Sequence, residues 1–91
     1  MSRTPLIAGN WKMHKTVAEA EEFIQGLLPR VSSVDGVDVG ICVPFTALQP
    51  MVDSTRGSRV EVYAQNMHYE PKGAFTGEIS AQMLSELDVH G

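Results

Sequence analysis

Short apolar runs alternate with stretches of helical periodicity along this 91-residue chain. Residues 5–9, 37–43 and 59–64 have the length and the apolar content of β-strands. Between these runs, apolar residues recur three and four positions apart, as they do on one face of a helix. The resulting order is strand, helix, strand, helix, strand, long loop and helix. This alternation predicts an α/β fold in which three parallel strands alternate with helices.

The first helix is predicted to begin at a capping box. In Thr16-Val17-Ala18-Glu19, the Thr16 hydroxyl can accept from the Glu19 amide while the Glu19 carboxylate accepts from the Thr16 amide. Pro29 marks the expected end of this helix, because proline lacks a backbone donor and disturbs the preceding turn. The apolar stripe of the helix is Val17, Ala20, Phe23, Ile24, Leu27 and Leu28.

Two more helices are predicted further along the chain. Thr46-Ala47-Leu48-Gln49 is a second candidate capping box, and the helix that it opens is expected to end near Gly57. Pro50 lies late in that helix for a first-turn proline. Ser80 is the expected N-cap of a short third helix. The apolar residues of these two helices are Leu48, Met51, Val52, Met83, Leu84 and Leu87.

Composition and charge exclude several classes of function. The chain is 43% apolar and 20% charged, as in an ordinary globular domain. Its net charge is −4 and its seven Lys and Arg residues form no cluster, so a nucleic-acid partner is not expected. Cys42 is the only cysteine, which excludes an internal disulfide and a cysteine-based metal site and favours the reducing cytoplasm. Neither a secretory signal nor a membrane span is expected at the N-terminus.

Candidate chemistry follows the first predicted strand. In parallel α/β folds, ligands bind beyond the carboxyl ends of the strands. Asn10 brings an amide that donates and accepts hydrogen bonds, and Lys12 brings a cation with three donors. These groups could hold a phosphate or another anionic oxygen. From residue types alone, a solvated lysine and a turn-capping asparagine are the more ordinary interpretation.

Several sequence segments favour the ligand-binding interpretation of Asn10 and Lys12 instead. Ala8-Gly9-Asn10-Trp11-Lys12-Met13 resembles the N-terminal signature of the triosephosphate isomerase family, and residues 73–80, Gly-Ala-Phe-Thr-Gly-Glu-Ile-Ser, resemble its loop after the third strand. Residues 43–45, 64–66 and 80–84 fit the same template in the right order. The resemblance covers essentially the whole chain, and two separate motifs at their proper distance make a chance agreement very improbable.

The resemblance implies the N-terminal portion of a (β/α)8 TIM barrel. A complete barrel takes about 250 residues, so residues 1–91 would be a partial barrel domain of roughly three βα units that stops before the fourth strand. Three parallel strands leave two open edges and apolar faces without neighbours. We therefore expect the isolated chain to be loosely packed or aggregated, and catalytically silent.

The resemblance also implies an activity, the interconversion of dihydroxyacetone phosphate and glyceraldehyde 3-phosphate through an enediolate. Asn10 and Lys12 match the family's substrate-binding and catalytic pair. Lys12 would bring positive charge to the substrate phosphate and to the developing enediolate oxygen. Trp11 between them is interpreted as a packing residue. The substrate is then a small phosphorylated triose, and no cofactor or metal is implied.

The three histidines match no catalytic position of the family. The catalytic histidine belongs to a Gly-His-Ser-Glu stretch after the fourth strand, whereas His90 precedes that strand and is interpreted as a linker residue. His14 and His68 are likewise interpreted as structural. The family's general base also lies further along the sequence, so both the base and the electrophilic histidine are expected to be missing from this chain.

The long loop of residues 65–79 predicts subunit contact. Loops of this length without regular structure usually have a function, and this one carries Met67, Tyr69 and Phe75. The resemblance implies that Phe75, Thr76 and Gly77 form a homodimer interface, with Thr76 reaching toward the partner's Asn10 and Lys12 region. The alternative is a non-catalytic truncated fragment that binds full-length subunits through this loop. A different enzyme on the same scaffold is a weaker third possibility.

Overall fold

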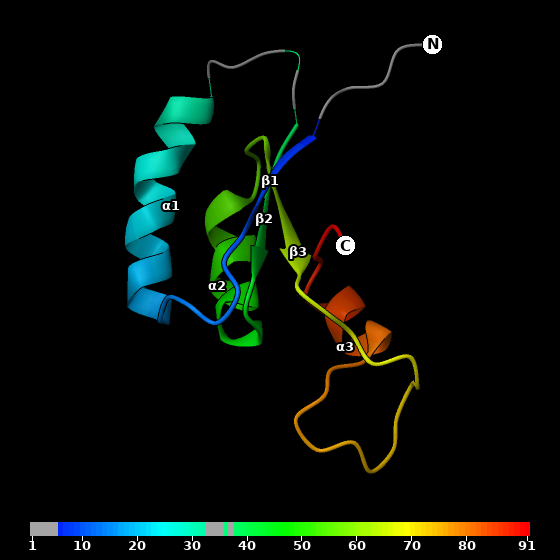
Figure 1. Cartoon of the computed structure of the whole chain (residues 1–91). Coiled ribbons are helices and arrows are strands. Elements are labelled where there is room, and N and C mark those ends of the chain that lie inside the picture. The colour runs from blue at the N-terminus through cyan, green and yellow to red at the C-terminus, as the bar shows by residue number, and fades with distance from the viewer. Residues whose placement is uncertain (1–5, 33–35, 37) are drawn as a thin grey trace.

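The computed structural model describes residues 6–32, 36 and 38–91. Within these residues, strands and helices alternate in the predicted order (Figure 1). The predicted strand starts at Pro5 and Val37 lie outside the described residues, and the third strand begins one residue later than predicted. The elements are β1 (Leu6–Asn10), α1 (Val17–Val31), β2 (Asp38–Val43), α2 (Phe45–Thr55), β3 (Val60–Ala64) and α3 (Ala81–Glu86).

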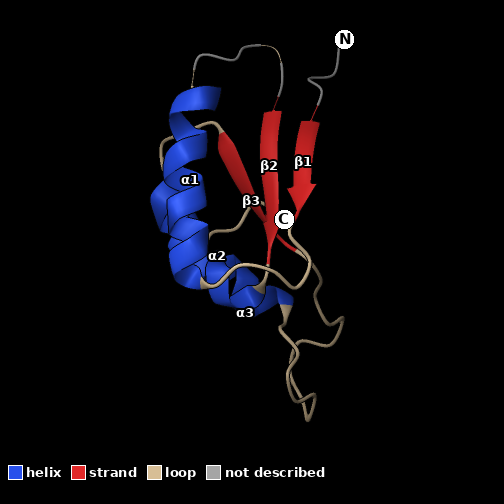
Figure 2. Cartoon of the chain, turned by 60° about the vertical axis from the view of Figure 1, so that its left-hand side comes forward, coloured by secondary structure: helices blue, strands red, loops and turns tan. Residues whose placement is uncertain are grey.

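The described strands form one parallel sheet in the order β1-β2-β3. Ile7 pairs with Val39, and Ile41 pairs with Val62, so neighbouring strands run in step. β3 lies at an edge of this sheet, as predicted. Figure 2 shows α1 and α2 together on one face of the sheet, which is where crossover helices of a single hand are placed. The α/β class with three parallel strands is confirmed.

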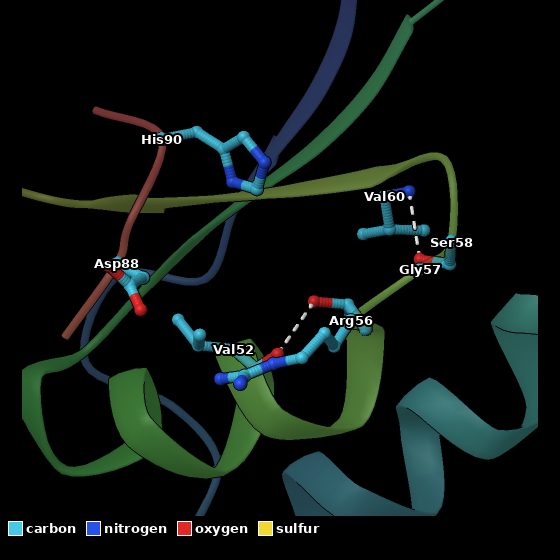
Figure 3. A pocket seen from close by; sticks show the side chains of 8 residues that line it. Val52, Arg56, Gly57, Ser58, Val60, Asp88 and His90 are labelled. Atoms are coloured by element: carbon cyan, nitrogen blue, oxygen red, sulfur yellow. Dashed lines mark hydrogen bonds between the residues drawn. The ribbon is translucent and has the colours of Figure 1, made fainter.

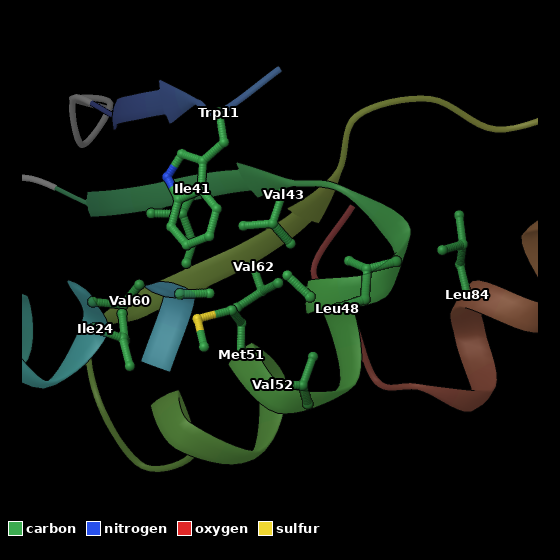
Figure 4. Close-up of a cluster of buried hydrophobic side chains, with 12 residues drawn as sticks. Trp11, Ile24, Ile41, Val43, Leu48, Met51, Val52, Val60, Val62 and Leu84 are labelled. Atoms are coloured by element: carbon green, nitrogen blue, oxygen red, sulfur yellow. The ribbon is translucent and has the colours of Figure 1, made fainter. Parts of the chain in front are cut away.

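The apolar core lies between that face of the sheet and the two longer helices (Figure 4). Leu48 and Met51 of α2 are completely buried, and Val52 is nearly so, as the sequence pattern predicts. On the opposite face the sheet is more open, and Ala8 of β1 is exposed. The sheet and α1 contribute Ile41, Val43, Val60, Val62, Ala20 and Ile24 to the core.

The predicted capping box at the start of α1 is confirmed. The Glu19 amide donates to the Thr16 hydroxyl at 3.3 Å, and the Thr16 amide donates to the Glu19 carboxylate at 3.0 Å. The backbone N–H groups of Thr16 and Glu19 therefore both have an acceptor, at a helix end where such groups otherwise lack one. The hydrogen bond from the Thr16 backbone is the main reason why the pKa of Glu19 lies below its ordinary value.

The predicted end of α1 at Pro29 is wrong, because the helix continues to Val31. Pro29 lies in the last turn, where its missing N–H deprives only one earlier carbonyl of a partner. Ser32 then completes the turn. Its amide donates to the Leu28 carbonyl at 3.1 Å, and its hydroxyl donates to the Pro29 carbonyl at 3.0 Å. Ser32 therefore gives two carbonyls of the final turn their donors, and the helix runs past the proline.

The predicted capping box at Thr46 is also wrong. α2 begins at Phe45 with Pro44 as its N-cap, and proline has no side-chain acceptor to offer. The first turn is closed instead by the Ala47 amide, which donates to the Pro44 carbonyl at 2.9 Å. Pro50 lies inside the helix without ending it. The helix does end near Gly57, whose φ of +80° suits a glycine after a helix terminus.

The short helix α3 begins at the predicted cap. The Ser80 hydroxyl accepts from the Met83 amide at 3.3 Å, and Leu84 is buried against the core. Residues 65–79, which precede it, are all described, and none of them lies in a helix or strand. Figure 1 shows this segment as a loop that projects away from the sheet. The predicted long loop is confirmed.

The segment after α3 returns to the outer edge of β3. The His90 amide donates to the Val62 carbonyl, and the Ala64 amide donates to the Gly91 carbonyl, both at 2.8 Å. The two bonds advance in the same direction along both segments, as they do in a parallel pair. In addition, the Val62 amide donates to Nδ1 of His90 at 3.0 Å. His90 is therefore more than a linker residue, because its backbone amide and its imidazole both bond to Val62 on the outer edge of β3.

Candidate active site at the strand ends

Asn10 and Lys12 lie at the carboxyl end of β1, where parallel α/β folds bind their ligands. Asn10 is the last residue of the strand, and Lys12 follows two residues later. Both side chains are exposed, so both can reach a molecule bound at this end of the sheet. The amide and the ammonium together offer hydrogen-bond donors and one positive charge, which suits an anionic oxygen.

The backbone at Lys12 is unusual. Its φ is +56°, in the left-handed region that residues other than glycine rarely occupy. The Asn10 side chain supports this conformation, because its Oδ1 accepts from the Lys12 amide at 2.9 Å. The Asn10 NH2 group is then the part of that side chain suited to donate to a ligand. Such conformations persist only where surrounding contacts hold them, and they are concentrated at functional sites.

A second tether comes from Gln65, the residue directly after β3. Its Nε2 donates to the Lys12 carbonyl at 2.8 Å and to the Cys42 carbonyl at 3.2 Å. The Trp11 amide donates to the same Cys42 carbonyl at 3.0 Å. One glutamine therefore joins the ends of all three described strands. Sequence reasoning missed this role, and the available signal was the polar residue placed directly after the apolar strand.

Trp11 is a packing residue, as interpreted from the sequence. It is 8% exposed, and Figure 4 shows its indole beside Ile41 on the helix-covered side of the sheet. Its ring meets the ring of Phe23 edge-on, with centroids 5.4 Å apart and planes at 84°. Trp11 thus anchors the loop on the side opposite to the exposed groups of Asn10 and Lys12.

The structure does not bring Phe75, Thr76 and Gly77 to Asn10 and Lys12 of the same chain. They lie in the projecting loop, where Phe75 stacks on His68 with centroids 4.0 Å apart. Tyr69 stacks on the same imidazole at 4.8 Å. Even so, Tyr69 is 84% exposed and Phe75 is 42% exposed. The loop therefore has internal order but presents aromatic surface outward.

A cavity of about 340 Å³ lies at the other end of β3 (Figure 3). Val60, Arg56 and His90 are among the residues that line it. It lies at the amino-terminal end of the strand, so it is separated from Asn10 and Lys12 by the length of the sheet. Its buried hydroxyl, that of Thr55, already donates to the Met51 carbonyl at 2.7 Å. This cavity therefore has no evident link to the strand-end chemistry.

His68 and His90 have structural partners. Nδ1 of His68 accepts from the Glu70 amide at 3.1 Å, and Nδ1 of His90 accepts from Val62. Across the residues that the structure describes, no three His, Cys, Asp or Glu side chains are grouped closely enough to hold a metal ion. In the same residues, no helix is both long and apolar enough to cross a membrane.

Comparison with known sequences decides the family. The family model described as triosephosphate isomerase matches residues 5–91, which is almost the whole chain. The chain belongs to the triosephosphate isomerase family. Its similarity to individual members of that family is also high. It is 51% identical over 87 residues to the triosephosphate isomerase of Carboxydothermus hydrogenoformans, and 56% identical over 84 residues to that of Acaryochloris marina.

A solved structure gives the same result for the fold. The crystal structure of triosephosphate isomerase from Bartonella henselae matches with a TM-score of 0.85 at 36% identity, over 96% of this chain. The match covers 35% of that structure's chain. The chain likewise spans 35% of the Carboxydothermus and Acaryochloris triosephosphate isomerases. The described elements therefore correspond to the first part of a TIM barrel.

Proposed function

We propose that these residues form part of the active site of a triosephosphate isomerase, which interconverts dihydroxyacetone phosphate and glyceraldehyde 3-phosphate. Residues 1–91 are then one portion of a single barrel domain of about 250 residues, and we refer to that complete barrel as the whole protein. The substrate is a small phosphorylated triose, and we place the reaction in the cytoplasm. The proposed reaction uses neither a metal nor a cofactor.

The observation that carries this proposal is the double tether on Lys12. Asn10 holds the Lys12 amide and Gln65 holds its carbonyl, so the backbone stays in a conformation that costs free energy. A merely solvated lysine needs no such support. The arrangement fixes the start of the lysine side chain at the carboxyl end of the sheet, which is the ligand-binding end of a barrel.

The chemistry explains why a fixed cation is useful here. The reaction removes a proton from the carbon beside a carbonyl, and negative charge then develops on the carbonyl oxygen. A cation that is already in place stabilises that charge without reorganising during the reaction. Lys12 can act on this oxygen and on the substrate phosphate, while the Asn10 NH2 group supplies a neutral donor.

Proton transfer needs two further groups. Triosephosphate isomerase is itself a standard example of this chemistry, with a glutamate as the base and a neutral histidine as the electrophile. Among the histidines of this chain, His68 and His90 are bonded through Nδ1 to nearby backbone amides. We propose that the base and the electrophile come from later strands of the whole protein.

The projecting loop supports a homodimer. Exposed aromatic rings are costly to leave in water, and Tyr69 and Phe75 lie in one ordered loop. We propose that Phe75, Thr76 and Gly77 contact a second copy of the whole protein. Thr76 then lies near the Asn10 and Lys12 region of that copy.

Substitution of Lys12 in the whole protein tests the proposal. Lys12→Met should lower turnover about 100-fold or more, because it removes the charge that acts on the developing oxyanion. Arg30→Met is the matched control, since Arg30 is an exposed cation in the last turn of α1. A coupled assay in both directions gives the turnover number. Normal turnover by Lys12→Met would show that the role given to Lys12 is wrong.

The exposed rings of the loop also favour the alternative, a non-catalytic piece that binds complete subunits. The 91-residue chain should show no isomerase activity when it is assayed alone. Mixing it with a second polypeptide that supplies the remaining barrel units separates the two possibilities. Recovery of activity supports the enzyme, whereas binding to intact dimers without recovery supports the alternative.

A further inference from the structure

Lys15 lies against two aromatic rings near the candidate active site. Its Nζ is 5.5 Å from the ring centroid of Trp11 and 5.0 Å from that of Phe23. Both distances are within the range of about 6 Å at which a cation is attracted to an aromatic face. Because the two rings also meet edge to face, the three side chains form one cluster, which we call the Lys15 cluster.

The backbone places the ammonium there. Lys15 has a φ of +73°, so the loop after β1 contains two left-handed residues that are not glycine, Lys12 and Lys15. Lys15 directly precedes Thr16, the N-cap of α1. After the hydrogen bonds from Thr16, the charge of Lys15 is a further cause that lowers the pKa of Glu19. The ammonium therefore lies at the start of α1 and folds back over the first residue of the loop.

Trp11 connects this cluster to Lys12. It is the covalent neighbour of Lys12, and its amide bonds to the Cys42 carbonyl that Gln65 also contacts. A shift of the indole would therefore displace the backbone that Asn10 and Gln65 hold in its left-handed form. These two side chains restrain the loop from the strand ends, and the Lys15 cluster restrains it from α1.

We propose that Lys15 is a positioning residue for the isomerase reaction. Its ammonium clamps the Trp11 and Phe23 rings and so keeps Lys12 in the conformation that serves catalysis. The inference rests on the function proposed for Lys12, and it adds a residue that does not itself touch the substrate. Phe23, which is partly exposed on α1, acts as the other half of the clamp.

Three variants of the whole protein test the clamp. Lys15→Met and Phe23→Leu should each lower kcat/KM roughly two- to fivefold, the size expected for losing an exposed cation–π contact. Lys15→Arg should remain near the parent value, because guanidinium keeps the contact with the rings. Arg30→Met serves again as a control for loss of a distant cation. Equal loss in Lys15→Arg and Lys15→Met would overturn the clamp.

Phe23→Leu separates positioning from simple charge. It leaves the net charge unchanged, so a long-range electrostatic effect of Lys15 on an anionic substrate predicts no loss for this variant. The clamp predicts that kcat/KM falls in Phe23→Leu as it does in Lys15→Met. This fall in kcat/KM should persist at high salt. Phe23→Leu with parent kinetics would therefore overturn the proposal. Thermal unfolding of each variant shows whether the fold is retained.

A double-mutant cycle with Lys12 completes the test. Competitive inhibition by inorganic phosphate is the probe, because it reports anion binding even where turnover is very low. Lys15→Met should weaken phosphate inhibition in the parent protein but add nothing in the Lys12→Met background. Additive effects would mean that Lys15 does not act through Lys12.

The two proposals fail in different ways. Normal turnover by Lys12→Met removes the function proposed for Lys12. Strong loss in Lys12→Met, together with parent kinetics in both Lys15→Met and Phe23→Leu, removes only the positioning role of Lys15.

Discussion

Two loops follow strands of the same sheet, yet they are stabilised in opposite ways. Residues 11–16 are bound to the rest of the chain through Trp11, Gln65 and the α1 cap. Residues 65–79 are ordered largely by contacts within the loop, such as the stack of Phe75 on His68. The first loop thus draws its order from the packed layer, whereas the second turns its aromatic surface outward.

The two loops should therefore respond to different kinds of substitution. A loop that is fixed by its own chain should respond to changes in core packing and helix capping. A loop with outward aromatic rings should respond to association between copies, and its substitution should leave the packed layer intact. Measurements on the whole protein can show whether a substitution weakens packing within one chain or association between copies, because only association depends on protein concentration.

The largest expected effect is in the packed layer. Met51 is completely buried between α2 and the sheet, so Met51→Ala removes apolar contacts and leaves a cavity. We expect a loss of about 2–5 kcal/mol in the free energy of unfolding. Denaturant unfolding at two protein concentrations measures it, and the loss should be the same at both. A loss below that range would show that the layer can close around the missing side chain.

A smaller effect is expected in the projecting loop. Phe75→Ala should raise the dimer dissociation constant about tenfold, as is usual for an aromatic contact worth more than ~1 kcal/mol. Analytical ultracentrifugation measures the constant. Val17→Ala is the control, because Val17 is also an exposed apolar residue but lies on α1. An unchanged constant for Phe75→Ala would count against the dimer contact of this loop.

The α1 cap gives the next smaller effect. Thr16→Ala should cost about 1 kcal/mol of stability, because the Glu19 amide loses its side-chain acceptor. Thr16→Ser keeps a hydroxyl and should retain most of that stability. If the cap also steadies the neighbouring loop, kcat/KM should fall slightly in Thr16→Ala alone. Equal stability of the two variants would show that the observed hydrogen bond contributes nothing measurable.

The smallest effect concerns alkaline pH. Partial burial, followed by its hydrogen bond to Glu61, raises the pKa of the Tyr63 phenol above its ordinary value of 10.0. The folded chain then holds this proton more tightly than the unfolded chain does. The contribution to stability is complete below pH 10 and is lost as the pH rises through the folded pKa. Tyr63→Phe should therefore show a shallower loss of stability above pH 10, and identical profiles would contradict this assignment.

Local signals predicted much of the fold correctly. The hydroxyls of Thr16 and Ser80 cap their helices because the partner amide lies three residues away, a distance that the sequence itself displays. Leu48 and Met51 are buried because helical spacing places them on one face. These inferences needed only neighbours in the chain.

The misses have a common physical cause. Pro29 was expected to end α1, yet the helix continues to Val31 and Ser32 closes its final turn. Pro44 is the N-cap of α2, although Thr46 had the better capping chemistry. Each outcome depended on how the following turn was completed. Gln65 is the clearest case, since it lies 53 positions from the Lys12 carbonyl to which it donates. The polar residue directly after the strand was a signal for a role of Gln65, but no local pattern identifies a partner so far away in the chain.

The left-handed backbone of Lys12 has a consequence for protein engineering. At a φ of +56°, glycine fits better than any residue with a side chain, so Lys12→Gly should relieve backbone strain. The same change would remove the cation that we place in the reaction. Selection for heat resistance and selection for turnover therefore favour different residues at this position. Ranking substitutions by folding free energy alone would favour glycine at position 12, so this position should be held fixed when the proposed activity is to be kept.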